Sequence, residues 1–291
     1  MRTVSSGYSL RTGAFCLGVA LCAVLFAAPA ANADYISGFE DLIASPFGEI
    51  LTGQDGYYIP PGTTSVDFLA YTYDGNVLEL PANPTGEDQF IGGTGPAGNA
   101  YARAQRDMSF AAGPIWIIGY DFAAVYLGSP PSANNIGSFS LRNEPAAVTH
   151  KIHLMSWVDP ENPTLFNAFY MAYDAGGTMF AQPGASPGAG WENLELNHWY
   201  RAWTKVDLDT NMIVEVGIID LETMEEWTFE PTDWYLAGGA AGTPALPECF
   251  RFFAGGGVAG NSLAFDNIDI HEEPLTPVES MSWGAIKSIF K

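Results

Sequence analysis

The sequence predicts an all-β protein whose strands form an antiparallel sandwich. Glycine and proline recur throughout, with 32 and 20 copies in 291 residues, and almost no window has the 3.6-residue periodicity of a helix. The runs between these turn signals are short and either alternate in polarity or are continuously apolar, as strands do. Because no crossover helices are expected between them, the strands should pair antiparallel rather than parallel.

Twelve strands are expected from these runs. They cover residues 35–41, 65–73, 101–110, 115–123, 137–143, 150–158, 165–173, 199–207, 212–220, 226–230, 250–254 and 263–271. Three long glycine-rich links separate some of them, at residues 91–100, 175–190 and 237–247. Links of this length are expected to be binding loops or disordered segments.

Residues 1–33 have the pattern of a secretory signal peptide. Arg2 and Arg11 supply positive charge, an uncharged apolar run follows at 14–28, and Ala31-Asn32-Ala33 is a small-residue cleavage site. The run is shorter than the roughly 20 residues that a membrane span needs. We therefore expect a protein that is secreted, extracellular or at the cell surface and begins at Asp34; an uncleaved anchor is the alternative.

The charge of the mature chain limits its partners. Residues 1–33 hold two of the 11 basic residues and none of the 33 acidic ones, so nine basic residues face 33 acidic ones and the net charge is −24. This charge disfavours nucleic acid and anionic membranes as partners, and it suits a soluble exported protein or one that binds divalent cations. Cys249 is the only cysteine left, so no intrachain disulfide can form.

The folded domain is expected to span residues 34–273 and to be followed by a linker and tail at 274–291. Pro274 and Pro277 mark the linker. In the tail, Trp283, Ile286 and Phe290 fall on one helical face. The tail is too short to span a bilayer, and no transmembrane span is expected in the mature chain. It is either a frayed end or a segment that docks on an envelope partner or membrane surface.

Three segments carry a resemblance to a known superfamily. Residues 199–220 read WYRAWTKVDLDTNMIVEVGIID, residues 38–41 read GFED, and residues 263–270 read LAFDNIDI. The first resembles the strand-turn-strand signature of laminin-G-like and legume-lectin-like domains, and the other two resemble paired terminal strands. The chain thus resembles the concanavalin A-like lectin/glucanase superfamily over residues 35–271. This implies an antiparallel jelly-roll β-sandwich, a fold shared by lectins, glycoside hydrolases and polysaccharide lyases.

Alternation along two strands suggests a sugar-binding surface. Arg201 and Trp203 share one face of the strand at 199–207, and His153 and Trp157 share one face of the strand at 150–158. Aromatic rings pack against sugar C–H faces, and polar groups bind hydroxyls. A single sheet face with these four residues would bind a glycan. The alternative places the tryptophans in the core and the charges at its rim.

A second cluster lies at 101–107, where Arg103 shares a face with Tyr101 and Gln105 and could bind a carboxylate sugar. Its order along the chain resembles alginate-lyase-type jelly rolls, with Lys151-Ile152-His153 and FRFFAGG at 250–256 following. The content departs from that pattern, because Gln105 stands for an acidic residue, Lys151 for a glutamine, and a phenylalanine for the catalytic tyrosine. A lyase needs a base to take the C5 proton and an acid to protonate the leaving oxygen. Because the tyrosine of the pattern is missing, a lyase is an alternative function and not the leading one.

Two calcium sites are considered. Glu40 or Asp41 could share a structural Ca²⁺ with Asp266 across the paired terminal strands. Residues 207–211 have the Asp-x-Asp-x-Asn spacing of a calcium loop, but the glycine and the closing glutamate of such a loop are missing. A hairpin turn explains the same residues without a metal.

The leading functional hypothesis is an exported lectin-like protein that binds a polysaccharide or cell-surface glycan without catalysis. The expected ligand-binding residues are Arg103, His153, Trp157, Arg201 and Trp203, and the expected metal ligands are Glu40, Asp41 and Asp266. One alternative is a polysaccharide lyase or glycoside hydrolase on the same scaffold, although no pair of catalytic carboxylates stands out. The other is a structural surface protein anchored through its C-terminal tail.

Overall fold

The computed structural model describes residues 34–98, 100–113, 115–145, 147–180, 184–240, 246–255 and 259–273. These residues form strands and turns and no helix, so the expected all-β class is confirmed. A membrane-crossing helix is accordingly absent from this part of the chain. The predicted signal peptide at 1–33 and the predicted tail at 274–291 lie outside the described residues.

Seventeen strands are assigned within the described ranges. They are β1 (Tyr35–Ser37), β2 (Glu49–Ile50), β3 (Tyr57–Tyr58), β4 (Ser65–Asp67), β5 (Leu69–Thr72), β6 (Gln89–Thr94), β7 (Tyr101–Asp107), β8 (Ile115–Tyr126), β9 (Asn135–Asn143), β10 (Val148–Trp157), β11 (Leu165–Phe169), β12 (Leu194–Glu195), β13 (Tyr200–Asp207), β14 (Met212–Asp220), β15 (Glu226–Phe229), β16 (Cys249–Ala254) and β17 (Asn261–Glu272).

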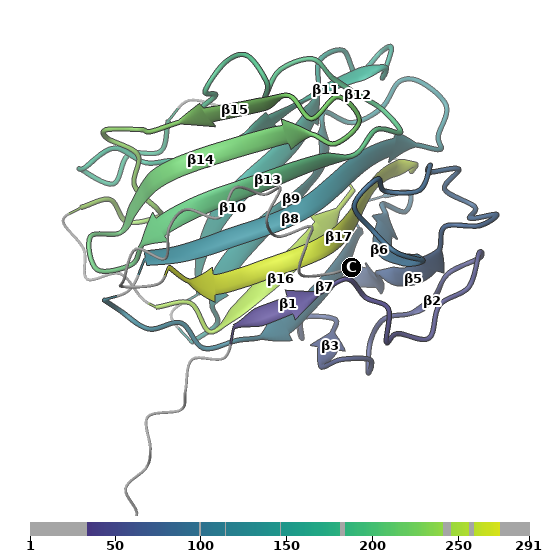
Figure 1. Ribbon diagram of the computed structural model, residues 1–291, viewed down its shortest axis with the longest axis horizontal. Helices are drawn as coiled ribbons and strands as arrows, with labels where there is room; N and C mark the ends of the chain where they lie inside the picture. Colours follow the sequence, from purple (N-terminus) through teal and green to yellow (C-terminus); the bar gives the residue numbers. More distant parts are fainter. Residues whose placement is uncertain are drawn as a thin grey trace, which may run out of the picture. The chain divides into compact units, whose positions relative to one another are not determined.

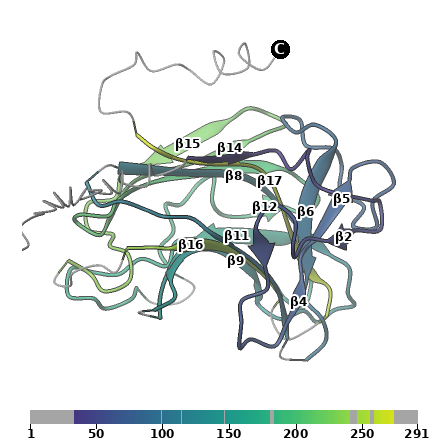
Figure 2. The same ribbon diagram turned by 90° about the horizontal axis from the view of Figure 1, so that it is seen from below.

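The strands form two sheets that pack face to face (Figure 1). Sheet A has the order β15-β14-β13-β8-β17-β6-β5-β2, with β1 paired to β17, and sheet B has the order β12-β11-β10-β9-β16-β7-β3, with β4 paired to β7. All of these pairs are antiparallel except β4–β7. Figure 2 shows β14, β8 and β17 above β16, β9 and β11, as two layers. The predicted antiparallel sandwich is therefore confirmed, and β1 lies beside β17 as the terminal segments predict.

Aromatic side chains fill the space between the sheets. Tyr120 of sheet A stacks on Phe139 of sheet B with ring centroids 4.6 Å apart, and Phe265 meets Phe252 at 4.5 Å. Such rings bury large apolar areas, and their contacts add specific geometry to the packing. Cys249 is buried and has no disulfide partner, and burial raises the pKa of its thiol to about 12. Apolar burial therefore holds the described sandwich together without a disulfide.

The expected loop at 91–100 is wrong at its start, because residues 89–94 form the buried strand β6. Its glycines are required by close packing rather than by a turn. A side chain at Gly93 would overlap the ring of Phe68, and a Cβ at Gly92 would lie 2.9 Å from Leu78 Cδ1. Gly92 and Gly93 thus let side chains on both sides of sheet A approach the β6 backbone.

Residues 73–88, between β5 and β6, cover part of the outer face of sheet A. Leu78 and Leu80 form a second apolar cluster there with Phe90 and Trp199. The indole of Trp199 donates a hydrogen bond to the carbonyl of Pro81 at 2.9 Å. This covering segment therefore excludes water from polar groups on the sheet beneath it.

The turn at 207–211 is a tight hairpin between β13 and β14. The carboxylate of Asp207 accepts hydrogen bonds from the backbone N–H of Asp209 at 2.9 Å and of Thr210 at 3.2 Å. Asn211 has a positive φ of 60°, which asparagine tolerates. These contacts account for the Asp-x-Asp-x-Asn spacing without a metal.

Candidate functional site

The outer face of sheet B carries a cluster of arginines. Alternate residues of β7 face the core, so Arg103 and Gln105 point away from it. The register places Gln105 opposite Arg251 of β16, and it places Arg142 of β9 in the next row, opposite Cys249. Three of the seven basic residues between positions 34 and 273 therefore lie on one surface. We call this surface the arginine face and define it by Arg103, Arg142 and Arg251.

Arg251 lies at the centre of the arginine face. Its Nε donates to Gln105 Oε1 at 2.7 Å, and its terminal nitrogen pairs with the carboxylate of Glu144. Burial lowers the pKa of Arg251, the charges of Arg142 and Arg103 lower it further, and Glu144 opposes them. Mutual repulsion among the three guanidinium groups is thus only partly compensated, so the face favours an anion.

Arg103 combines its charge with aromatic surfaces. Its guanidinium donates to Ser65 Oγ at 2.7 Å and lies 4.9 Å from the ring centroid of Tyr101 and 5.6 Å from that of Phe253. Burial lowers the pKa of Arg103, and the charge of Arg142 adds to this effect. Rings next to a cation provide both kinds of contact that a charged sugar requires.

Tyr58 supplies a titratable hydroxyl at the edge of the same face. Its oxygen accepts a hydrogen bond from Gln105 Nε2 at 2.6 Å and donates one to Asp107 Oδ1 at 2.6 Å. Burial raises the pKa of Tyr58 to about 12, and the hydrogen bond to Asp107 raises it as well. A chain of hydrogen bonds therefore runs from Asp107 through Tyr58 and Gln105 to Arg251.

The expectation that His153, Trp157, Arg201 and Trp203 share one sheet face is wrong, because β10 and β13 belong to different sheets. His153 is fully buried between the sheets, where its Nδ1 lies 2.6 Å from the hydroxyl of Tyr120. Burial lowers the pKa of His153 to about 3. Trp157 is 3% exposed and donates to Asn261 Oδ1 at 3.1 Å. Both side chains are buried in the interior, so neither can contact a ligand.

The pairing of β10 explains part of this result. A register shift between Lys151 and His153 puts an extra residue, Ile152, into the strand. Ile152 joins the core, and His153 then also faces the core. A β-bulge of this kind changes the face on which the following side chains lie. Simple alternation along the strand therefore could not place His153 correctly.

Arg201 and Trp203 lie together on the outer face of sheet A, as alternation in their strand predicts. Trp203 packs flat over Gly217, and its indole donates to Glu215 Oε1 at 3.2 Å. Arg201 NH1 lies 3.0 Å from Asp121 Oδ1. Both side chains are nearly buried by these contacts. They form part of the packing on this face, away from the arginine face.

Two buried carboxylates form a polar centre beneath the covering segment 73–88. Asp121 and Asp266 are register partners on β8 and β17, and both are fully buried. Asn83 Nδ2 donates to Asp121 at 2.8 Å and to Asp266 at 3.0 Å, and the hydroxyl of Tyr73 donates to Asp266 at 2.7 Å. Burial raises the pKa of Asp266 to about 8, and the negative charge of Asp121 adds to this shift.

The other expected metal ligands have different surroundings. Glu40 Oε1 accepts hydrogen bonds from the backbone N–H of Asp88 at 2.9 Å and of Gln89 at 3.2 Å, and Asp41 is exposed. The described residues contain no group of three or more His, Cys, Asp or Glu side chains that could hold a metal. Calcium binding by Glu40, Asp41 and Asp266 thus stays a prediction. Any ion at Asp266 would need oxygen ligands besides carboxylates.

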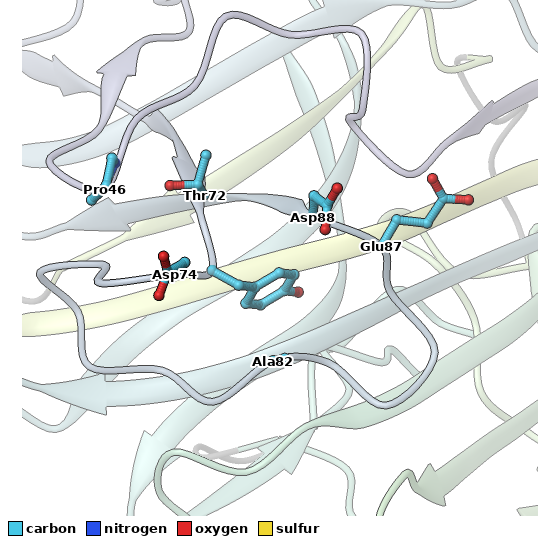
Figure 3. Close-up of a pocket in the computed structure, with 7 residues that line it drawn as sticks. Pro46, Thr72, Asp74, Ala82, Glu87 and Asp88 are labelled. Carbon is cyan, nitrogen blue, oxygen red and sulfur yellow. The ribbon is translucent and has the colours of Figure 1, made fainter.

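A shallow hollow of about 640 Å³ opens beside this polar centre. Figure 3 shows the acidic side chains of Asp74, Glu87 and Asp88 around it. Tyr73 lines the hollow and reaches Asp266 with its hydroxyl. The acidic lining makes the hollow unsuitable for an anionic ligand, in contrast to the arginine face.

Sequence reasoning missed four residues of the arginine face and its edge: Tyr58, Arg142, Glu144 and Arg251. A local signal existed for Arg251: it stands between Phe250 and Phe252, which both face the core, so its own side chain points to the opposite face of the strand. Glu144 and Tyr58 gave no signal, because their roles depend on contacts with strands more than 40 residues away. Arg103 was expected as a ligand residue and lies on this face.

No protein-family model matches the chain, and no curated protein matches it. The structure is similar to an endo-β-1,4-glucuronan lyase from the fungus Trichoderma reesei, with 12% identity, coverage of 78% of this chain and 94% of that one, and a TM-score of 0.40. It is also similar to the alginate lyase Aly36B, with 15% identity, coverage of 65% of this chain and 83% of that one, and a TM-score of 0.42. A third similar structure is a Bacillus licheniformis β-glucanase, with 10% identity, coverage of 84% of this chain and 100% of that one, and a TM-score of 0.37. Lyases and glucanases are among the classes that the sequence resemblance implies.

Proposed function

We propose that this protein binds a carboxylate-bearing polysaccharide on the arginine face of sheet B. The observation that supports the proposal is the clustering of Arg103, Arg142 and Arg251 on one surface of a chain with 33 acidic residues. Elsewhere such a chain repels an anionic polymer, so the arginines provide a local attraction against an unfavourable overall field. The polymer would be a polyuronate, whose sugar rings carry a carboxylate at every step.

The chemistry of the face suits a repeated carboxylate. Guanidinium groups bind carboxylates through two parallel hydrogen bonds, and these charge-assisted bonds are stronger than bonds between neutral groups. Tyr101 and Phe253 lie under Arg103 and offer rings for the C–H side of a sugar. The strands of sheet B place these groups side by side, as a linear polymer requires.

The test is a binding panel with the purified 34–273 domain against a polyuronate, a sulfated polysaccharide and a neutral glucan. We expect saturable binding to the polyuronate, weaker binding as salt rises because the charges are screened, and none to the neutral glucan. Equal binding to all three polymers, or binding to the neutral glucan alone, would contradict the proposal. Preference for the sulfated polymer would assign the arginines to sulfate instead.

We also propose a structural Ca²⁺ near Asp266, with Asp121 rather than Glu40 or Asp41 as its second carboxylate. The carboxylates of Asp121 and Asp266 lie close enough in a buried site to accept hydrogen bonds from the same amide nitrogen of Asn83, and carboxylate oxygens are ligands that Ca²⁺ takes. A cation would also offset the repulsion that raises the pKa of Asp266. To test for this ion, the binding panel is repeated in calcium and in a chelator, and a melting curve is recorded in each condition. The same melting temperature in both conditions would exclude a structural Ca²⁺.

A second candidate function is a polysaccharide lyase, which Tyr58 and its hydrogen bonds favour. Tyr58, as a phenolate whose oxygen accepts a hydrogen bond from Gln105, could take the C5 proton of a uronate. The C5–H electron pair would form a C4–C5 double bond as the C4–O bond breaks, and Tyr58 would return the proton to the leaving oxygen. Gln105 bonds both Tyr58 and Arg251, so the charge of Arg251 lies one residue away from Tyr58 and could offset that of the uronate carboxylate.

Replacing Tyr58 with phenylalanine separates the two candidates. If the protein is a lyase, Tyr58→Phe is expected to reduce turnover by about 10²–10⁴-fold, as loss of a general acid–base group does, while polyuronate affinity stays within about threefold. Turnover is followed by the ultraviolet absorbance of the new double bond. Absence of turnover in the unmodified protein would exclude the lyase and leave non-catalytic binding.

A further inference from the structure

We propose that Glu144 is an internal competitor for the arginine face: its carboxylate occupies the arginines that would hold a uronate, and a bound polymer displaces it. This inference rests on the proposed function of the same surface. It adds a residue that sets the affinity, and it predicts that removing this residue strengthens binding.

Glu144 holds two of the three arginines with one oxygen. Its Oε1 lies 2.9 Å from Arg142 Nε and also pairs with the terminal nitrogen of Arg251. Burial alone would raise the pKa of Glu144, but the hydrogen bond from Arg142 and the charge of Arg251 outweigh it and lower the pKa. The side chain is therefore an anion that presents to the arginines the same group as a uronate.

The contacts of the three residues show which of them can move away. The side chain of Glu144 is 38% exposed, whereas those of Arg142 and Arg251 are 21% and 13% exposed. Glu144 directly follows β9, in a turn that its own carbonyl closes by accepting a hydrogen bond from the backbone of Ala147 at 3.1 Å. The carboxylate can therefore rotate into solvent with little change in the sheet.

The arginines keep their positions when Glu144 leaves, because each has a second anchor. Arg251 stays bonded to Gln105, and Arg142 stays bonded to the hydroxyl of Thr149. Both anchors are neutral, so departure of Glu144 leaves two guanidinium charges without a counter-ion. A ligand carboxylate can pair with both guanidinium groups in place of Glu144. The observed free energy of polyuronate binding is then reduced by the free energy needed to break the Glu144 ion pairs.

Two variants of Glu144 test the inference. Glu144→Gln removes the charge, and Glu144→Asp keeps the charge but shortens its reach. We expect both to bind polyuronate more tightly than the unmodified protein, with Glu144→Gln gaining about five- to tenfold, the size expected for lost surface ion pairs. Calorimetric titration at low salt measures the affinities, and melting curves confirm that the variants fold.

Glu248→Gln is the matched control, because it removes one negative charge from an exposed side chain that precedes Cys249 on the same sheet. It should change the affinity less than twofold. Suppose that the unmodified protein binds polyuronate but the Glu144 variants bind it no more tightly than the unmodified protein or the Glu248→Gln control. The competitor role is then wrong, while the proposed function stands. If no form of the protein binds polyuronate, the proposed function fails, and the inference fails with it.

Discussion

Replacing Arg251 with methionine is expected to weaken polyuronate binding by about 10- to 100-fold, because a hydrogen bond to a charged group contributes roughly 1.5–3 kcal/mol. Arg251 is the central cation of the arginine face and lies between Gln105 and Glu144. Methionine keeps the unbranched apolar stem of the side chain and removes the guanidinium group with its charge and donors. Titration of the polymer at fixed salt gives the ratio of affinities.

Lys205→Gln is the control for this experiment. It also removes one positive charge, but Lys205 lies on sheet A, where it pairs with Glu215 at 3.1 Å and Glu273 at 3.1 Å. A change of less than twofold for Lys205→Gln would show that location rather than net charge matters. Equal losses in the two variants would mean that the polymer senses only the overall field and that the arginine face is not the binding site.

Replacing Asp121 with alanine is expected to destabilise the fold by about 3–5 kcal/mol, the usual cost of breaking a buried ion pair. Asp121 is fully buried and accepts hydrogen bonds from Arg201 at 3.0 Å, Asn83 at 2.8 Å and Asn267 at 2.7 Å. The variant leaves these donors without their acceptor under a covering segment that excludes water. Urea unfolding in the presence of a chelator measures the change in the free energy of unfolding.

The exposed carboxylate of Asp233 provides the comparison. Asp233→Ala should change the free energy of unfolding by less than about 0.5 kcal/mol, as surface substitutions usually do. A loss below about 1 kcal/mol for Asp121→Ala would show that water reaches the polar centre and solvates the donors. The segment 73–88 would then not act as a cover.

Strand identity could be predicted from the sequence wherever alternation and turns agree. The hairpin at 199–220 is the clearest example. Arg201 and Trp203 share one face of the strand as predicted, and Asp207 closes the turn. The core residues of this strand, Tyr200, Ala202 and Val206, lie on its other face. Strand β6 was missed because Gly92 and Gly93 are typical of loops. Their role becomes visible only when Phe68 and Leu78 are seen to pack against them.

The candidate site was predicted less well, because it depends on which strands become neighbours. Alternation placed Arg103 on an outer face correctly, but it could not tell that β7 pairs with β16 and so brings Arg251 beside Gln105, which is 146 residues away in sequence. It also could not tell that β10 and β13 lie in separate sheets. His153 and Trp157, which the sequence pattern predicted to bind a ligand, are buried in the hydrophobic interior instead.

Strand β17 follows all the other described strands in the sequence, yet it lies inside sheet A, hydrogen-bonded to β8, β6 and β1. Its neighbours cannot close around one another until residues 261–272 arrive, so the order of synthesis delays completion of the fold. A nascent chain would therefore keep sheet A open between β8 and β6 until residues 261–272 had been made, and its aromatic core would stay partly exposed until then.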